Sequence, residues 1–138
     1  MKLLTFQTDR FAWRPHERTW DDAHVTPSSG EVQDAVVAFL HVEIPDVSAP
    51  NTTRAIRKTL KHIKWVANKG ELKTVVLHSF AHLGGDTAPA SEAQNFLSTV
   101  ADRLEATGYE VQMTPFGWFS AWDIDVRGHS MAKVWKAF

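Results

Sequence analysis

Short apolar runs and apolar–polar alternation predict five strands along the chain. The clearest alternation lies at residues 121–126, where aspartates separate Trp122, Ile124 and Val126, as in a strand with one buried face. The run at 34–43 is mostly apolar and predicts a long buried strand, which ends before Pro45 because proline cannot donate a hydrogen bond to a sheet. The other predicted strands cover residues 2–7, 74–80 and 109–113.

A second period, of three and four residues, predicts helices. In residues 53–68 apolar side chains recur at this spacing and form one stripe. Another helix is predicted after Pro89, where Ser91 and Gln94 have the spacing of a capping box. Residues 131–137 are expected to form a short final helix.

The predicted elements follow one another in the order ββαβαββα, which indicates an α/β (α+β) protein with helices packed over a sheet. We expect a single domain, residues 1–138, because the length suits one core and no linker or repeat interrupts the pattern. Residues 16–30 are polar and rich in turn-forming residues, so this segment is expected to be irregular.

Composition excludes several kinds of chemistry. The chain has no cysteine, which rules out disulfides, thiol nucleophiles and cysteine-ligated metals. The seven histidines show no metal-ligand spacing and no phosphate-binding glycine loop is present, so neither a metal nor a cofactor is expected. Early charge rules out a signal peptide and no apolar run could span a bilayer, so a cytoplasmic protein without a membrane segment is expected.

Charge is unevenly distributed along a nearly neutral chain, whose formal net charge is −1. Six of the fifteen basic residues lie between positions 52 and 69, with no acidic residue among them. This face could bind nucleic-acid phosphates, or it could simply be solvated. Solvated faces usually mix charge signs, which keeps phosphate binding open. The residues opposite the apolar stripe are Arg54, Arg57, Lys58, Lys61 and Lys64.

Two loops that follow predicted strands carry candidate chemistry. In residues 80–86, His82 can titrate near neutral pH and the glycines allow a ligand to approach the backbone closely. Ligands of α/β sheets gather at such loops, although His82 could instead only brace its own loop. Residues 114–120 are crowded with aromatic side chains, which could wall a pocket or stack on a base, or could pack in the core.

Several segments together resemble one known family. They are the FAHL sequence at 80–83, the helix after Pro89, the TPFGWF sequence at 114–119 and the RGH sequence at 127–129. In this order and at closely similar spacing, they resemble the N-terminal editing domain of archaeal threonyl-tRNA synthetases. The beginning of the chain and the long strand that contains Val42 match as well, so the resemblance covers nearly the whole chain.

The resemblance implies the fold of D-aminoacyl-tRNA deacylase, with a mixed sheet, flanking helices and a homodimer. It implies hydrolysis of serine wrongly attached to threonine tRNA, assisted by the ribose 2′-hydroxyl of the terminal adenosine. A freestanding domain would act in trans on the 3′-aminoacyl-adenosine end of tRNA, with a separate threonyl-tRNA synthetase as a further candidate partner. The residues expected at the substrate are Val42, Phe80, Ala81, Pro115, Phe116, Gly117, Trp118 and Phe119.

Three of the family's four polar site positions differ in this chain. His82 is kept, whereas Phe119 and Ser120 replace a tyrosine and a lysine, and Lys133 replaces a glutamate. The expected catalytic residues are therefore His82, Ser120 and Lys133, with the Lys133 ammonium taking the place of the one lost at Ser120. Two alternatives stay open: a catalytically degenerate module that binds tRNA or an amino acid, and a deacylase of altered amino-acid specificity.

Overall fold

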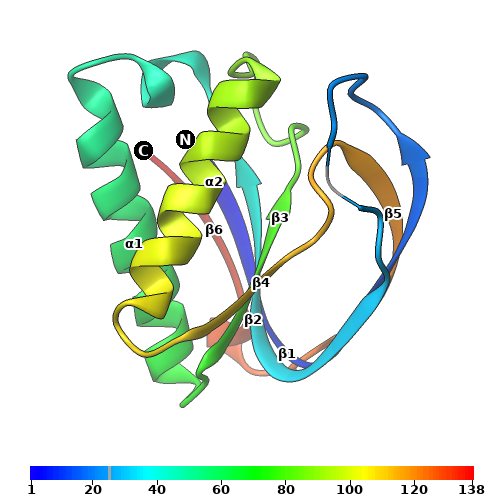
Figure 1. Ribbon diagram of the computed structural model, residues 1–138. Coiled ribbons are helices and arrows are strands. Elements are labelled where there is room, and N and C mark those ends of the chain that lie inside the picture. Colours follow the sequence, from blue (N-terminus) through cyan, green and yellow to red (C-terminus); the bar gives the residue numbers. More distant parts are fainter. Residues whose placement is uncertain (25) are drawn as a thin grey trace.

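The computed structural model describes residues 1–24 and 26–138 and contains one mixed sheet with helices on one of its faces (Figure 1). Val25, within the segment 16–30 that is expected to be irregular, lies outside the described residues. The strands are β1 (Lys2–Arg18), β2 (Gly30–His41), β3 (Thr74–Ser79), β4 (Glu110–Met113), β5 (Trp118–Val126) and β6 (Lys133–Ala137). The helices are α1 (Asn51–Lys69) and α2 (Ala90–Glu105), and short 3₁₀ turns cover Ile44–Val47 and Ser130–Ala132.

The sheet has the strand order β4-β3-β2-β1-β5, and β6 also pairs with β1. Strands β2, β3 and β4 run parallel, whereas β1 is antiparallel to each of its neighbours. One edge of β1 is shared, because residues 2–6 pair with β6 and residues 8–18 pair with β5. This mixed sheet with packed helices confirms the fold class that the sequence predicts.

Two apolar clusters stabilise the molecule, one on each side of the sheet. On the helix side, α1 and α2 bury Ile63 and Leu97 in the same cluster as Leu77 of β3. The apolar stripe predicted for residues 53–68 is therefore the buried face of α1. On the opposite side lies a smaller aromatic cluster, whose buried members, such as Phe11 and Phe39, all come from β1, β2 and β3.

Strand β1 is much longer than the predicted segment 2–7, because it continues through two irregularities to Arg18. One of these lies between Pro15 and Glu17, where the pairing with β5 shifts. Proline is tolerated at such a shift, because an irregular position leaves its missing N–H outside the ladder.

The other irregularity, around Asp9, changes which face of the sheet alternate residues of β1 occupy. Phe6 and Phe11 both pack in the aromatic cluster, although residues an odd number of positions apart face opposite sides of a regular strand. Arg127 stabilises this point, because its Nε donates to Asp9 Oδ1 over 2.9 Å. The irregularity thereby places Phe11 on the same face of the sheet as Phe6.

Two local predictions are wrong. Residues 131–137 do not form the expected helix but continue from a 3₁₀ turn into β6, which pairs with the beginning of β1. The predicted capping box is also incorrect, because Pro89 is the N-cap of α2, no side chain caps it, and Ser91 lies inside the first turn.

Candidate active site

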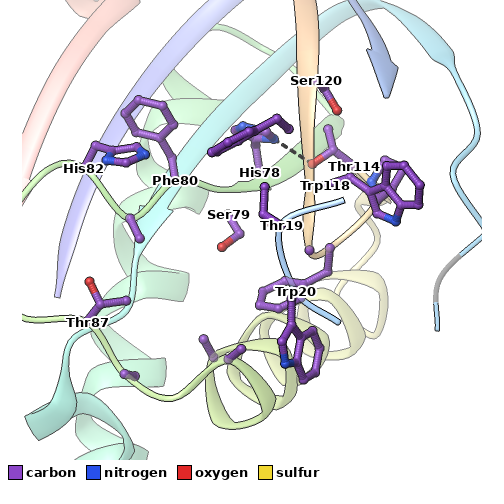
Figure 2. A pocket seen from close by; sticks show the side chains of 18 of the residues that line it. Thr19, Trp20, His78, Ser79, Phe80, His82, Thr87, Thr114, Trp118 and Ser120 are labelled. Atoms are coloured by element: carbon purple, nitrogen blue, oxygen red, sulfur yellow. Dashed lines mark hydrogen bonds between the residues drawn. The ribbon is translucent and has the colours of Figure 1, made fainter. Parts of the chain in front are cut away.

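A cavity of about 450 Å³ opens beyond the carboxyl end of β3 (Figure 2). Figure 2 shows His82 and Phe80 on one side of it, and Trp118 and Ser120 on the other. The loop after β3 and the turn before β5 therefore converge on one space. Its lining consists of Thr19, Trp20, His78, Ser79, Phe80, Ala81, His82, Thr87, Ala88, Ala90, Ala93, Thr114, Pro115, Phe116, Gly117, Trp118, Phe119, Ser120 and Trp122.

The buried side chain of His41 holds the loop that carries His82 through hydrogen bonds. The backbone N–H of Leu83 donates to His41 Nδ1 over 3.0 Å, so this nitrogen carries no proton. His41 Nε2 lies 2.6 Å from the carbonyl oxygen of Asp86, to which it donates. The imidazole of His82 is exposed and packs edge-on against Phe80, with 5.1 Å between the ring centroids.

The opposite wall depends on a glycine turn that rests on residues just after β1. Gly117 has φ +83°, and a Cβ there would lie 2.8 Å from Ala23 Cβ. The N–H of Thr19 donates to the carbonyl of Gly117 over 2.7 Å, and Trp20 packs edge-on against Phe116 at 5.7 Å. The irregular segment after β1 thus supports the turn and supplies two lining residues.

Strand β5 contributes four residues to the cavity lining, namely Trp118, Phe119, Ser120 and Trp122. The indole nitrogens of both tryptophans and the hydroxyl of Ser120 are buried without a hydrogen-bond partner among the described residues. The Trp122 ring also closes the aromatic cluster, with its centroid 4.8 Å from that of Phe39. This wall is apolar but carries hydrogen-bonding groups beneath its surface.

His78, the penultimate residue of β3, is a lining residue that the sequence pattern did not predict. Its Nδ1 lies 2.7 Å from Thr114 Oγ1, and only 5% of the residue is exposed. Burial lowers the pKa of His78 to about 4, so its imidazole is neutral near pH 7. The signal in the sequence is an imidazole directly after the apolar run 75–77, two residues before Phe80 and therefore on the same face.

Two of the predicted site residues lie elsewhere. Val42 is buried in the helix-side core and does not line the cavity; its carbonyl accepts a hydrogen bond from Ala88. Lys133 is exposed on β6 and pairs with Phe6, whereas Ser120 pairs with Pro15. Phe6 and Pro15 are nine positions apart on β1, roughly 30 Å at the usual rise of a strand. The Lys133 ammonium therefore does not replace the missing lysine at Ser120, and this relocation hypothesis is wrong.

The other nine predicted residues all line the cavity, from Phe80 to His82 and from Pro115 to Ser120. None of the described lining residues is acidic, and none is a lysine or an arginine. Within residues 1–24 and 26–138, no group of three or more side chains could hold a metal ion. Nor does either helix in the described part of the chain have the length and apolar character needed to cross a membrane.

Comparison with solved structures defines the class of fold. The chain superposes on a protein described as c-Myc DNA unwinding element binding protein with a TM-score of 0.68 and 12% identity, covering 100% of this chain and 99% of the other. It superposes on a probable eukaryotic D-amino acid tRNA deacylase with a TM-score of 0.65 and 11% identity, covering 92% and 94% of the two chains. The fold is therefore that of the D-aminoacyl-tRNA deacylases.

The sequence places the chain more narrowly: residues 1–138 belong to the family described as the archaea-specific editing domain of threonyl-tRNA synthetase. Threonine–tRNA ligase of Pyrobaculum aerophilum is 30% identical over 100% of this chain and 22% of its own length. The ligase of Hyperthermus butylicus is 28% identical over 97% of this chain and 22% of its own length. The chain thus spans about a fifth of the length of these curated relatives.

Proposed function

We propose that this cavity hydrolyses the ester bond of a mischarged tRNA, most specifically Ser-tRNA(Thr). The observation that carries the proposal is the convergence of the His82 loop and the Gly117 turn on one cavity, in a chain of the editing-domain family. A volume of about 450 Å³ falls within the range of sites for small molecules, and it suits a small amino acid attached to a terminal adenosine.

The absence of charged groups from the described lining favours a reaction that relies on the substrate itself. Water attacks the ester carbonyl, the bond between this carbon and the ribose 3′-oxygen breaks, and the amino acid is released as the free acid. The proton lost by the water ends on the 3′-oxygen, and the ribose 2′-hydroxyl assists by hydrogen bonding. Backbone N–H groups of the His82 loop and of the uncapped first turn of α2 can stabilise the developing oxyanion. In this mechanism His82 orients the reacting groups, and Ser120 adds a neutral hydrogen-bonding group.

A second site that removes serine makes physical sense, because the aminoacylation site of a synthetase discriminates poorly between serine and threonine. One methyl group is worth only about 1–3 kcal/mol in a pocket. A tight cavity can instead exclude threonine sterically. The Trp118 and Phe119 side chains on β5 supply the bulk for such exclusion.

Helix α1 is the proposed tRNA-binding surface. Arg54, Arg57 and Lys61 are exposed, and none of them forms an ion pair with an acidic side chain in the described part of the chain. Lys58 and Lys64 are half-buried beside them. We extend the proposal to action in trans in the cytoplasm, with a separate threonyl-tRNA synthetase as a candidate partner and the protein acting as a homodimer.

The test measures ester loss from threonine tRNA charged with radiolabelled serine or threonine. We expect the protein to accelerate loss of serine and to leave threonine in place, and we expect His82→Ala to slow the reaction at least tenfold. His129→Ala is the matched control, because His129 is also exposed but does not line the cavity. Absence of acceleration for any aminoacyl-tRNA would overturn the proposal.

One observation favours a second candidate, a module that binds aminoacyl-tRNA without hydrolysing it. Phe119 and Ser120 bring no phenol or ammonium to the cavity, and Lys133 lies far from it. Tight binding of seryl-tRNA without ester loss would identify this binding function. Faster loss of an amino acid other than serine would instead identify a deacylase of altered specificity.

A further inference from the structure

The pair formed by His78 and Thr114 joins the two walls of the cavity. His78 comes from the end of β3 and Thr114 from the segment after β4, and their side chains hydrogen-bond over 2.7 Å (Figure 2). The backbone N–H of Thr114 also donates to the carbonyl of Leu77 over 3.1 Å, which fixes the position of this segment. Both side chains line the cavity.

The His78 ring is held in one orientation. Its centroid lies 5.0 Å from that of Phe39 and 5.2 Å from that of Trp122, and the Trp122 ring is nearly perpendicular to it. With Nδ1 bound to Thr114, the second nitrogen, Nε2, forms no hydrogen bond with any described residue. The site therefore contains a fixed imidazole with one nitrogen free for a ligand.

The chemistry of this pair matches a hydroxyl group. If the Thr114 hydroxyl donates to Nδ1, then Nε2 carries the proton and can donate; if it accepts, then Nε2 is free to accept. A neutral imidazole that is hydrogen-bonded to a hydroxyl can thus be either a donor or an acceptor at Nε2. A ligand hydroxyl can pair with it in both cases, because a hydroxyl both donates and accepts. The uncharged lining offers no competing charged partner for His78.

We propose that His78 contacts the substrate through Nε2 and recognises a hydroxyl group, while Thr114 is a positioning residue that sets the orientation and tautomer of the ring. This inference rests on the proposed function, because that function supplies a ligand with hydroxyl groups. The hydroxyl belongs either to the terminal ribose or to the side chain of the amino acid. His82, exposed and packed on the far side of Phe80, is a separate group.

The test measures binding rather than turnover, so that it does not depend on hydrolysis. The probes are stable amide analogues in which serine is joined to 3′-amino-3′-deoxyadenosine, a matched analogue with alanine, and a seryl analogue that also lacks the ribose 2′-hydroxyl. Calorimetry gives their affinities for the wild-type protein, His78→Phe, Thr114→Val and Thr114→Ser. Phenylalanine keeps an aromatic ring at this position and removes both nitrogens.

We expect His78→Phe and Thr114→Val to weaken binding of the seryl analogue about tenfold, as the loss of one buried hydrogen bond implies. Thr114→Ser should bind this analogue as tightly as the wild type. The analogue that lacks the contacted hydroxyl should bind the wild type and both variants equally. If the wild type, His78→Phe and Thr114→Val bind the alanyl analogue equally, the contacted group is the hydroxyl of the amino acid. If they bind the analogue without the 2′-hydroxyl equally, the contacted group is the ribose hydroxyl. An equal loss for all three analogues, or no loss for any, would overturn the inference.

A measurement on the wild-type protein guards against variants that misfold. The ¹⁵N resonance of His78 Nε2 should shift when the seryl analogue binds, and it should shift less with the analogue that lacks the contacted hydroxyl. Identical shifts with all three analogues would contradict the contact. If seryl-tRNA is not hydrolysed but this pattern of binding appears, the hydrolytic function fails and the assignment of His78 stands.

Discussion

His41 shows how a residue outside the cavity controls its geometry. Its imidazole is fully buried and accepts from the Leu83 N–H, while its other nitrogen contacts Asp86 and Thr87 in the same loop. The position of His82 therefore depends on a histidine that contacts no substrate. This dependence can be tested by removing the imidazole.

We expect His41→Ala to lower the free energy of unfolding by about 2–4 kcal/mol, because it leaves buried backbone groups of the loop without partners. Urea denaturation gives this value, and faster hydrogen exchange of the Leu83 amide would locate the change in the loop. His129→Ala, at an exposed position, should change stability by less than about 0.5 kcal/mol. Unchanged exchange at Leu83 would show that His41 does not hold the loop.

The buried imidazole of His78 predicts a pH-dependent stability. Its pKa is lowered to about 4 by burial, so between the ordinary value of 6.5 and about 4 the unfolded chain binds a proton that the folded protein does not. The contribution of His78 to the free energy of unfolding should be fully present above pH 6.5. It should fall, by up to about 3 kcal/mol, as the pH decreases to 4. The pKa of His62 is lowered by burial and by Lys136, and it adds to the same trend.

Urea unfolding between pH 4 and 7 measures this slope for the wild type and for His78→Phe. The variant should lose the His78 contribution and keep that of His62, so its stability should depend less steeply on pH. Parallel pH profiles for the two proteins would mean that His78 takes up a proton equally in the folded and unfolded states.

Among the elements, the turn between β4 and β5 is constrained by both its backbone and its surroundings. Gly117 lies in the left-handed region, and an added methyl group would collide with Ala23. We expect Gly117→Ala to cost about 1–3 kcal/mol and to displace the turn from residues 19–23, which weakens substrate binding. Gly85→Ala is the matched control, since a Cβ there meets nothing within 4 Å. Equal stability of the two variants, from thermal unfolding, would contradict the account.

Helix α1 presents its basic face to solvent while its apolar face is buried. Changing Arg54, Arg57 and Lys61 to glutamine should weaken tRNA binding at least tenfold. It should also make the slope of log affinity against log salt concentration shallower, by the amount that corresponds to about two to three lost phosphate contacts. Filter binding at several salt concentrations measures both quantities. The control replaces Lys73 and Arg103, which are exposed but lie outside α1, and it should change neither quantity appreciably.

At the scale of the whole molecule, we expect two copies to associate through the face of the sheet opposite the helices. Trp135 on β6 is 56% exposed and pairs with Leu4, which packs against the aromatic cluster on that face. Large exposed aromatic groups favour such contacts. Light scattering should give about twice the chain mass of 15.5 kDa for the wild type and the single mass for Trp135→Glu. Trp65→Glu on α1 should remain dimeric, and a monomeric wild type would refute dimerisation.

Local periodicity was sufficient for the elements that bury a regular face. The stripe of α1 and the apolar run of β3 both depend on neighbouring residues, and the sequence placed them within a few positions. The convergence of the His82 loop with the Gly117 turn was predictable from the resemblance, because both flank the ends of strands. The participation of Trp20 was not, since it depends on packing against Phe116.

Elements stabilised by distant partners were not predictable from local patterns. Residues 131–137 have apolar residues at helical spacing, yet pairing of Lys133 with Phe6 makes them a strand. The extension of β1 past Pro15 likewise depends on β5, more than a hundred residues later. His78 was missed for a related reason, because its neighbour Thr114 comes from another strand connection.

The irregularity around Asp9 limits the changes in length that β1 can accept. Deleting one residue there would move the side chains of Phe11 and Trp13 to the opposite face of the sheet, and their neighbours would then face the aromatic cluster. Insertions and deletions should therefore be rejected at this point of β1.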